Sequence, residues 1–343
     1  MNGFPQGKNL THVKSSNLSA VLEAIMRLGP ISRIEISSLT GLTSSTITNL
    51  VNELLYHGLV CESGSAASQG GRRRTLLSLN VDACWLGAIA VQESRIQGAL
   101  LNLAAETRWH VEESYTDAAV ACEQLGERLL GLAATQGQPV VGFGIGSSPH
   151  VALPPTVMHK LQLPVTTDTE VRVSALGEAW FGVGSEVRSL AYVSADQPMA
   201  VGMVMDRQLY RGAHGIAGLL PCAACTDLQT MVEQGQQGHP TVQEGLRSLA
   251  VVVALTMGLY DPQAVVVGGS LAEWFPGLPA ALMNCDILRE LGVSRQQPVL
   301  FTSKLGREAT VVGAACLVLQ EFVAHPIEFL SSARAIAQAA AGG

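Results

Sequence analysis

Charged residues are scarce in this chain. Asp, Glu, Lys and Arg together make up 14% of the 343 residues, whereas hydrophobic residues make up 48%. A chain with so little charge and so much apolar surface can bury a large core, which excludes a mainly disordered protein. The length is sufficient for two or three domains. We therefore expect a well-packed globular protein, with disorder confined to its ends.

Long hydrophobic runs are also missing. A membrane-spanning helix needs about twenty consecutive apolar residues, and the longest candidate, Leu249–Leu259, is too short. The first residues, Met1–Lys8, contain no apolar signal core. These absences predict a soluble cytoplasmic protein without a membrane partner.

The cysteines do not form the pattern of a disulfide-rich protein. There are seven of them, an odd number scattered along the chain and mostly in apolar surroundings. Such thiols are typical of the reduced core of a cytoplasmic protein rather than of a disulfide framework.

What the chain does contain is a helix-turn-helix pattern at Ile31–Val60. A short first helix ends at Gly41, where a left-handed turn costs least. Thr43 or Ser44 is a candidate N-cap for a second helix. The apolar positions of the first helix are Ile34, Ile36 and Leu39, and those of the second are Ile47, Leu50, Val51, Leu54 and Leu55.

The other face of the second helix carries short polar side chains without negative charge. Such groups suit phosphates and base edges when a recognition helix enters the major groove of DNA. The helices alone leave open a small helical hairpin with a solvated polar face. The face consists of Ser44, Ser45, Thr46, Thr48, Asn49 and Asn52, of which we predict the first five to contact DNA.

A predicted wing favours DNA binding over the hairpin. Strands at Leu59–Glu62 and Thr75–Leu79 enclose a glycine- and serine-rich loop. An arginine cluster on a flexible loop suits the narrow, electronegative minor groove or flanking phosphates. The loop ends in three candidate DNA-binding residues, Arg72, Arg73 and Arg74.

The net charge is distributed unevenly. The whole chain carries a formal charge of -7, but residues 1–80 hold seven Lys and Arg against four Glu, which gives +3 and leaves -10 for the remainder. This asymmetry fits a basic DNA-reading head on an acidic body.

Two similar series of strands and helices follow residue 80, after a helix predicted at Asn17–Leu28. Strands that alternate with helices indicate an α/β body, and the repetition suggests two lobes with a ligand cleft between them. We therefore divide the chain into a winged helix-turn-helix domain at 1–80 and a body at 81–343. The expected strands are Leu86–Val91, Gly98–Leu103, Val140–Ile145, Leu190–Ser194, Ala200–Met205 and Ala264–Val267, and the expected helices are Ala118–Thr135, Val242–Leu259 and Gly313–Val323.

In combination, several stretches make the chain similar to the ROK family, which groups bacterial sugar-responsive repressors with sugar kinases. The resemblance implies a two-lobed actin-like (ribonuclease H-like) body behind the DNA-binding head, and homodimers or homotetramers. It spans almost the whole chain and is carried by the G-G-R-R-R of the wing, Pro164–Gly182, Leu209–Gly218, Asp261–Gly269 and Gly306–Ala315.

The nucleotide positions depart from the family pattern. Family kinases hold ATP phosphates with two glycine-rich turns, whose backbone N–H groups approach the phosphates closely. Gly87–Glu93 lacks the family's Asp-x-Gly, and in Asp196–Ala200 the residue Pro198 removes a backbone donor. We therefore expect neither ATP binding nor enzyme activity, and no cofactor.

The metal positions depart as well. Leu219 and Cys222 occupy the places of the family's sugar-binding glutamate and zinc-binding histidine. Cys222 and Cys225 would supply only two of the four ligands that structural zinc requires, so we favour two ordinary thiols over a residual metal site.

The sugar pocket has also lost several polar groups, because the loop before Pro164 is short. Glu170 aligns with the family's catalytic aspartate. Because carboxylates are mostly exposed, we favour a solvated loop carboxylate there, and the other interpretation is an acceptor for a sugar hydroxyl. The candidate ligand-binding residues are Glu170, Arg211 and His214, although His214 would also serve to order its loop.

The favoured hypothesis is a transcriptional regulator, a repressor that reads a palindromic double-stranded operator as a dimer and responds to a sugar or sugar derivative. The alternative is a ROK-type sugar kinase with an added DNA-binding head, which ATP-dependent heat in calorimetry would reveal. A third reading makes the body a dimerisation platform without an effector. The sequence identifies neither the effector nor the operator.

Overall fold

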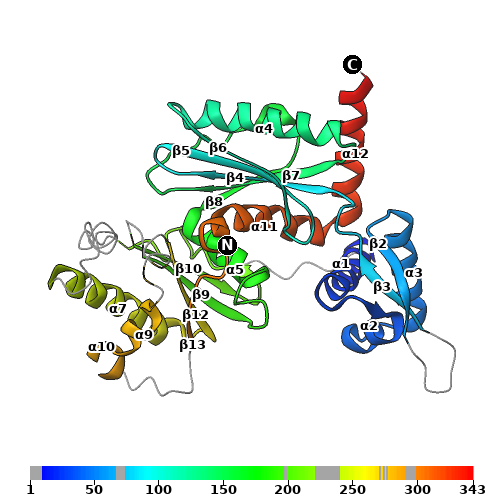
Figure 1. Cartoon of the computed structure of the whole chain (residues 1–343). Helices are drawn as coiled ribbons and strands as arrows, with labels where there is room; N and C mark the ends of the chain where they lie inside the picture. The colour runs from blue at the N-terminus through cyan, green and yellow to red at the C-terminus, as the bar shows by residue number, and fades with distance from the viewer. Residues whose placement is uncertain are drawn as a thin grey trace.

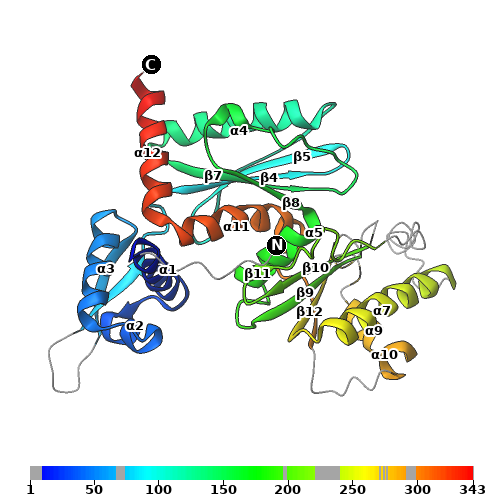
Figure 2. The same cartoon turned by 180° about the vertical axis from the view of Figure 1, so that it is seen from behind.

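The computed structural model describes residues 10–66, 74–195, 199–220, 240–269, 272, 275, 277–290 and 299–342. They form a small head, residues 10–79, beside a body of two α/β lobes (Figure 1). Figure 2 shows the same arrangement from behind, with helix α12 running from the head along the first lobe.

The head has the layout of a winged helix. Three helices pack with an antiparallel three-stranded sheet of order β1-β3-β2. The strands predicted on either side of the wing are present, and β1 is an additional short strand. The elements are α1 (Leu10–Leu28), β1 (Ile31–Ser32), α2 (Arg33–Thr40), α3 (Ser44–Tyr56), β2 (Val60–Ala66) and β3 (Arg74–Leu79).

Capping residues set the ends of α2 and α3. Ser32 is the N-cap of α2, and its backbone N–H donates to Glu35 Oε2 at 2.9 Å. Hydrogen bonds from the Ser32 hydroxyl and backbone lower the pKa of Glu35. Gly41 ends α2 with φ at 70°, and the Thr43 side chain accepts from the backbone N–H of Thr46 at the start of α3. The predicted turn is confirmed at both ends.

The first helix is longer than the sequence indicated. We expected Asn17 as its N-cap and a polar lead-in before it, but α1 begins at Leu10. Lys14 Nζ lies 2.9 Å from Glu53 Oε2 on α3, which fastens an early turn of the helix to the head. Because the two residues are 39 positions apart, a local sequence pattern does not reveal this contact.

The apolar pattern of α2 was only partly informative. Of its three predicted core positions, Ile36 is buried, whereas Ile34 and Leu39 are each 59% exposed. A helix of eight residues has room for few inward positions, so two apolar residues of α2 face solvent.

The first lobe is built on a five-stranded sheet of order β6-β5-β4-β7-β8. β4, β7 and β8 are parallel, whereas β5 and β6 run antiparallel to their neighbours. Helix α4 covers one face of the sheet with a buried apolar cluster. The elements are β4 (Trp85–Val91), β5 (Arg95–Leu101), β6 (Thr107–Ser114), α4 (Ala118–Thr135), β7 (Val140–Ser147), η1 (His159–Leu161) and β8 (Val165–Thr169).

The second lobe repeats this arrangement. Its sheet has the order β11-β10-β9-β12-β13, again with two antiparallel and two parallel pairings. Helices α7 and α9 pack on one face through a second apolar cluster. The elements are α5 (Glu170–Trp180), β9 (Ser189–Ser194), β10 (Ala200–Met205), β11 (Gln208–Leu209), α7 (Pro240–Tyr260), β12 (Ala264–Gly268), α9 (Leu278–Met283), α10 (Asp286–Glu290), β13 (Val299–Thr302), η2 (Gly306–Glu308), α11 (Ala309–Ala324) and α12 (Pro326–Gly342).

Two equivalent helices hold the lobes together. α5 follows the last strand of the first sheet and α11 follows the last strand of the second, and they pack against each other at the centre of the body. Glycine permits the close approach, since a Cβ at Gly313 of α11 would lie 1.7 Å from the carbonyl oxygen of Val173 on α5. The predicted fold class, a winged helix-turn-helix followed by a two-lobed α/β body, is confirmed.

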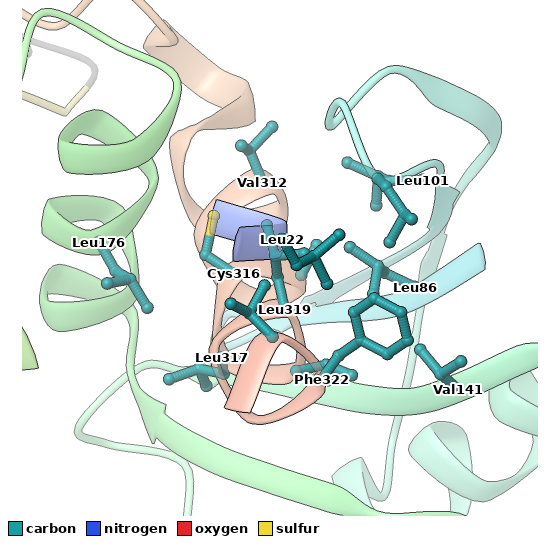
Figure 3. Close-up of a cluster of buried hydrophobic side chains, with 14 of the residues drawn as sticks. Leu22, Leu86, Leu101, Val141, Leu176, Val312, Cys316, Leu317, Leu319 and Phe322 are labelled. Atoms are coloured by element: carbon teal, nitrogen blue, oxygen red, sulfur yellow. The ribbon is translucent and has the colours of Figure 1, made fainter. Parts of the chain in front are cut away.

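The head packs directly on the body. Leu22 of α1 belongs to the same buried cluster as Leu319 and Phe322 of α11, and Figure 3 shows the three side chains close together. Ser15 Oγ also donates to the carbonyl oxygen of Ala324 at 3.0 Å. The head and the body therefore share one apolar cluster and do not have separate cores. The domain division at residue 80 stays a prediction.

The remaining sequence expectations concern cysteines and membrane spans. Cys84, Cys122 and Cys316 are buried free thiols, whereas Cys61 is exposed. Burial raises the pKa of Cys122 to about 12.

Among the described residues, no single helix is long and apolar enough to cross a membrane, although α11 and α12 together have the length and composition of a span as a bent pair.

Candidate nucleic-acid interface and interlobe cleft

The outer face of α3 carries the predicted major-groove residues. Ser44, Ser45, Thr48 and Asn49 are exposed, whereas Thr46 is half-buried. The opposite face of the helix is buried in the core of the head. The cap and this packing hold the polar face in one orientation, as groove readout requires. Contact between these residues and DNA stays a prediction.

The polar residues of this face differ in whether their side chains already have hydrogen-bond partners within the helix. Thr43 Oγ1 lies 2.9 Å from Thr46 Oγ1 and 3.0 Å from Ser45 Oγ, so both hydroxyls belong to the capping arrangement. Thr48 Oγ1 donates to the carbonyl oxygen of Ser44 at 2.8 Å, and its lone pairs remain as acceptors. Asn49 has an exposed amide with donors and an acceptor, which suits the paired donor and acceptor edge of adenine.

The polar face extends further than the sequence analysis proposed. Tyr56, at the C-terminal end of α3, is 87% exposed and follows exposed Asn52 at helical spacing. A tyrosine hydroxyl at this place can donate to a DNA phosphate. Continuing the polar face for one more turn beyond Asn52 would have identified it.

One of the three wing arginines lies within the described residues. Arg74 begins β3 with an exposed side chain, and its charge contributes to lowering the pKa of Glu35 after the hydrogen bonds from Ser32. β3 pairs with β1 at Leu76 and Ser32, which places Arg74 near the start of α2. Arg72 and Arg73 lie outside the described residues, so the wing contacts stay predictions.

A polar cavity of about 450 Å³ lies between the two lobes. We call it the interlobe cleft. Its walls combine amide, carboxylate, guanidinium and hydroxyl groups, which together can pair with the hydroxyls of a polyhydroxylated ligand. The residues that line it include Gln92, Ser94, Arg95, Gln97 and Glu112 from the first lobe, Glu170 and Ser174 from α5, and Tyr192, Ser194, Arg307 and Thr310 from the opposite side.

Of the three predicted ligand-binding residues, Glu170 lines the interlobe cleft. It is half-buried at the first position of α5, so it is neither in a loop nor fully solvated. Arg211 and His214 are exposed and do not belong to the lining. The structure therefore does not bring the three residues together in one cavity, and the cleft's two arginines, Arg95 and Arg307, went unnoticed in the sequence.

Arg211 has a different partner, a buried carboxylate that the sequence analysis missed. Asp168 is 3% exposed, and its Oδ2 accepts from Arg211 Nε at 2.6 Å. Its Oδ1 accepts from Arg172, which is 4% exposed, at 3.1 Å. Arg172 Nη2 donates in turn to the carbonyl oxygens of Gly215 and Ala217. These contacts fasten the 211–217 turn to the start of α5, beside the cleft.

Only some of the residues considered for metal and nucleotide binding lie within the described part of the chain. Within the described residues, no group of three His, Cys, Asp or Glu side chains could hold a metal ion. Cys222, Cys225 and Pro198 lie outside those residues. The first degenerate phosphate turn is described, and its Gln92 lines the cleft.

Comparison with known proteins gives a consistent pattern. The family model described as "ROK family" matches residues 142–220 and 223–321. A xylose repressor of Caldicellulosiruptor bescii is 33% identical over 239 residues, which cover 61% of this chain and 59% of that protein. A xylose repressor of Bacillus subtilis is 23% identical over 91% of this chain and 97% of its own length.

Solved structures agree on the fold. A ROK family transcriptional regulator, described as a homolog of the Escherichia coli MLC protein, matches with a TM-score of 0.76 at 20% identity, over 93% of this chain and 99% of its own. A ROK family glucokinase from Streptomyces griseus matches with a TM-score of 0.53 at 18% identity, over 68% of this chain and 98% of its own. The kinase match omits about a third of the chain, whereas the regulator match includes nearly all of it.

Proposed function

The chain belongs to the ROK family, and we propose that it is a DNA-binding transcriptional repressor of the cytoplasm whose operator binding is controlled by a sugar or sugar derivative. The observation that carries this proposal is the capped helix α3, which exposes Ser45, Thr48 and Asn49 on a head packed against a body that contains a ligand-sized cleft between its lobes. The relatives that are named as repressors support this proposal more strongly than they support the sugar-kinase alternative.

The interlobe cleft is the proposed effector site. Glu170 would accept a hydrogen bond from a sugar hydroxyl, and charge-assisted hydrogen bonds contribute about 1.5–3 kcal/mol each. D-xylose and N-acetylglucosamine are the first compounds to test, because relatives are named as a xylose repressor and an N-acetylglucosamine repressor.

Replacing Glu170 by glutamine tests this site. We expect the better of the two sugars to raise the melting temperature of the native protein, since a ligand that binds only the folded state stabilises it. Glu170→Gln should weaken sugar binding roughly 10- to 100-fold, because it removes a charge-assisted hydrogen bond. Thermal shift across a sugar titration measures both effects. The control is Glu328→Gln, an exposed carboxylate on α12, and an unaltered sugar response in Glu170→Gln would argue against the cleft.

An apolar face on α7 is the proposed dimer interface. Val251, Leu255 and Leu259 are 39%, 55% and 72% exposed and recur every four residues along the helix. Antiparallel pairing about Leu255 would bury Val251 of one copy against Leu259 of the other. Such self-complementarity is what a two-fold interface requires, and a dimer matches a palindromic operator.

Leu255→Asp is expected to convert the dimer to monomers, because it places two carboxylates opposite each other in an apolar interface. Operator affinity should fall at least about tenfold, since the second half-site no longer benefits from a tethered partner. Sedimentation velocity measures the assembly state, and fluorescence anisotropy measures binding. Val120→Asp, at a half-exposed position on α4, is the matched control. A dimer that persists in Leu255→Asp would rule out this interface.

A further inference from the structure

A second cavity lies where the head meets the body, outside the interlobe cleft. It has a volume of about 760 Å³, and we call it the junction cavity. The head supplies the C-terminal end of α1 and part of β3, the first lobe supplies Leu103, and the second lobe supplies Trp180 and Arg207. Because the head and both lobes form its walls, a ligand there would contact all three parts of the molecule.

Two guanidinium groups give this cavity a positive side. Arg27 reaches it from α1 and is 45% exposed, with Glu23 at 3.7 Å. Arg207 reaches it from the β10–β11 turn, and its pKa is lowered by burial and then by the charge of Arg27. The acids nearby are Glu23 and the exposed Glu186, which is part of the wall. Arg207 is thus a partly desolvated cation without a carboxylate among its described ion pairs.

Contacts hold Arg207 in place. Its guanidinium carbon lies 5.4 Å from the ring centroid of Trp180, and its Nη2 donates to the carbonyl oxygen of Ser185 at 2.7 Å. Its own carbonyl oxygen accepts from Gln320 on α11. Arg207 also has φ at 63°, a left-handed conformation that few non-glycine residues adopt. An arginine fixed in this way loses little freedom when it binds an anion.

Another part of the wall of the junction cavity is aromatic and apolar. Trp180 and Phe181 lie side by side with ring centroids 6.3 Å apart, and Leu79 and Leu103 are among the aliphatic residues of the wall.

We infer that the junction cavity is a second ligand site, which takes a small planar organic carboxylate. The carboxylate would lie between Arg27 and Arg207, and the ring would pack on the aromatic and leucine side chains. This ligand class combines the charge that the guanidiniums select with the flat apolar surface that Trp180 and Phe181 accept. The site does not depend on the function proposed for the interlobe cleft.

The position of the site gives it a regulatory consequence. Helix α5 begins at Glu170 in the interlobe cleft and ends at Trp180 in the junction cavity. A ligand in either cavity therefore contacts one end of the same buried helix, and the junction ligand also contacts α1 of the head. Binding at the junction changes operator affinity by altering how the head sits on the body.

Calorimetry with benzoate tests the inference on the full-length protein. We expect saturable benzoate binding, and much weaker binding of benzyl alcohol, which has the ring without the charge, and of acetate, which has the charge without the ring. Arg27→Gln and Arg207→Gln should each weaken benzoate binding at least about tenfold, which corresponds to one lost charge-assisted contact. Arg27 is half-exposed, so its variant keeps the test valid if Arg207→Gln fails to fold.

A control variant locates the probe. Arg128→Gln removes an arginine on α4 that is 49% exposed and should bind benzoate as the native protein does. Failure of benzoate to bind, or binding that is equal in Arg27→Gln and Arg128→Gln, would overturn the site. Operator affinity that benzoate leaves unchanged in the native protein would overturn its regulatory role.

Discussion

Asn49→Ala is expected to lower operator affinity by roughly 5- to 150-fold for each half-site, which is the range for losing one bidentate contact to a base. The effect should be concentrated at one base pair of each half-site. Asn49 lies on the exposed face of α3, beyond the hydroxyls that serve the cap, and its amide matches the paired donor and acceptor of adenine. In a dimer each subunit loses this contact, so the loss of affinity occurs at both half-sites.

The measurement compares native and variant protein on operators that carry every base at each position. The native protein should discriminate at the Asn49 position, and the variant should bind all four versions with similar affinity. Asn284→Ala, which removes an amide at the end of α9, is the matched control because α9 lies far from the head (Figure 1). Unchanged base preference in Asn49→Ala would show that another face of the head reads the sequence.

Asp168→Ala is expected to destabilise the protein by about 3–5 kcal/mol, because it leaves a buried guanidinium without its counter-charge. Arg172 is 4% exposed and pairs with Asp168, whereas Arg211 is 47% exposed and can turn to water. The free energy of unfolding from urea titration measures the loss. The carbonyl contacts of Arg172 remain, but they supply no negative charge.

The matched control for this prediction is Asp82→Ala. Asp82 also pairs with an arginine, Arg108 at 2.8 Å, but the two side chains are 44% and 34% exposed. Exposed pairs contribute up to about 1 kcal/mol because water screens them. If the two alanine variants lose the same stability, burial of Asp168 does not have the consequence that we derive from it.

Local signals in the sequence predicted the elements of the fold that depend on local chemistry. Gly41 and Thr43 delimited the turn before α3 because backbone conformation and capping are properties of single residues. Helix α4 was predicted at its observed bounds, Ala118–Thr135. The edge strand β6 and helix α12 were not predicted, since exposed strands and apolar terminal helices have weaker periodic patterns.

The candidate site was harder to predict because its contacts are distant in sequence. Arg211 was assigned to a ligand on the basis of family resemblance, but the fold places it 2.6 Å from Asp168, 43 residues earlier. Arg95 and Arg307 come from different lobes and meet only in the interlobe cleft. No local pattern links such residues, whereas Glu170 was found because it sits inside a recognisable motif.

Salt-titrated fluorescence anisotropy shows whether the chain is a sugar-controlled DNA-binding protein, when it is measured on a duplex that the full-length protein selects from a random pool. We predict saturable binding that weakens as salt rises, because phosphate contacts release counterions. The same binding should change when D-xylose or N-acetylglucosamine is added to the native protein, and not when it is added to Glu170→Gln. A protein that selects no duplex from the pool, or that binds every duplex alike with and without sugar, would contradict the account.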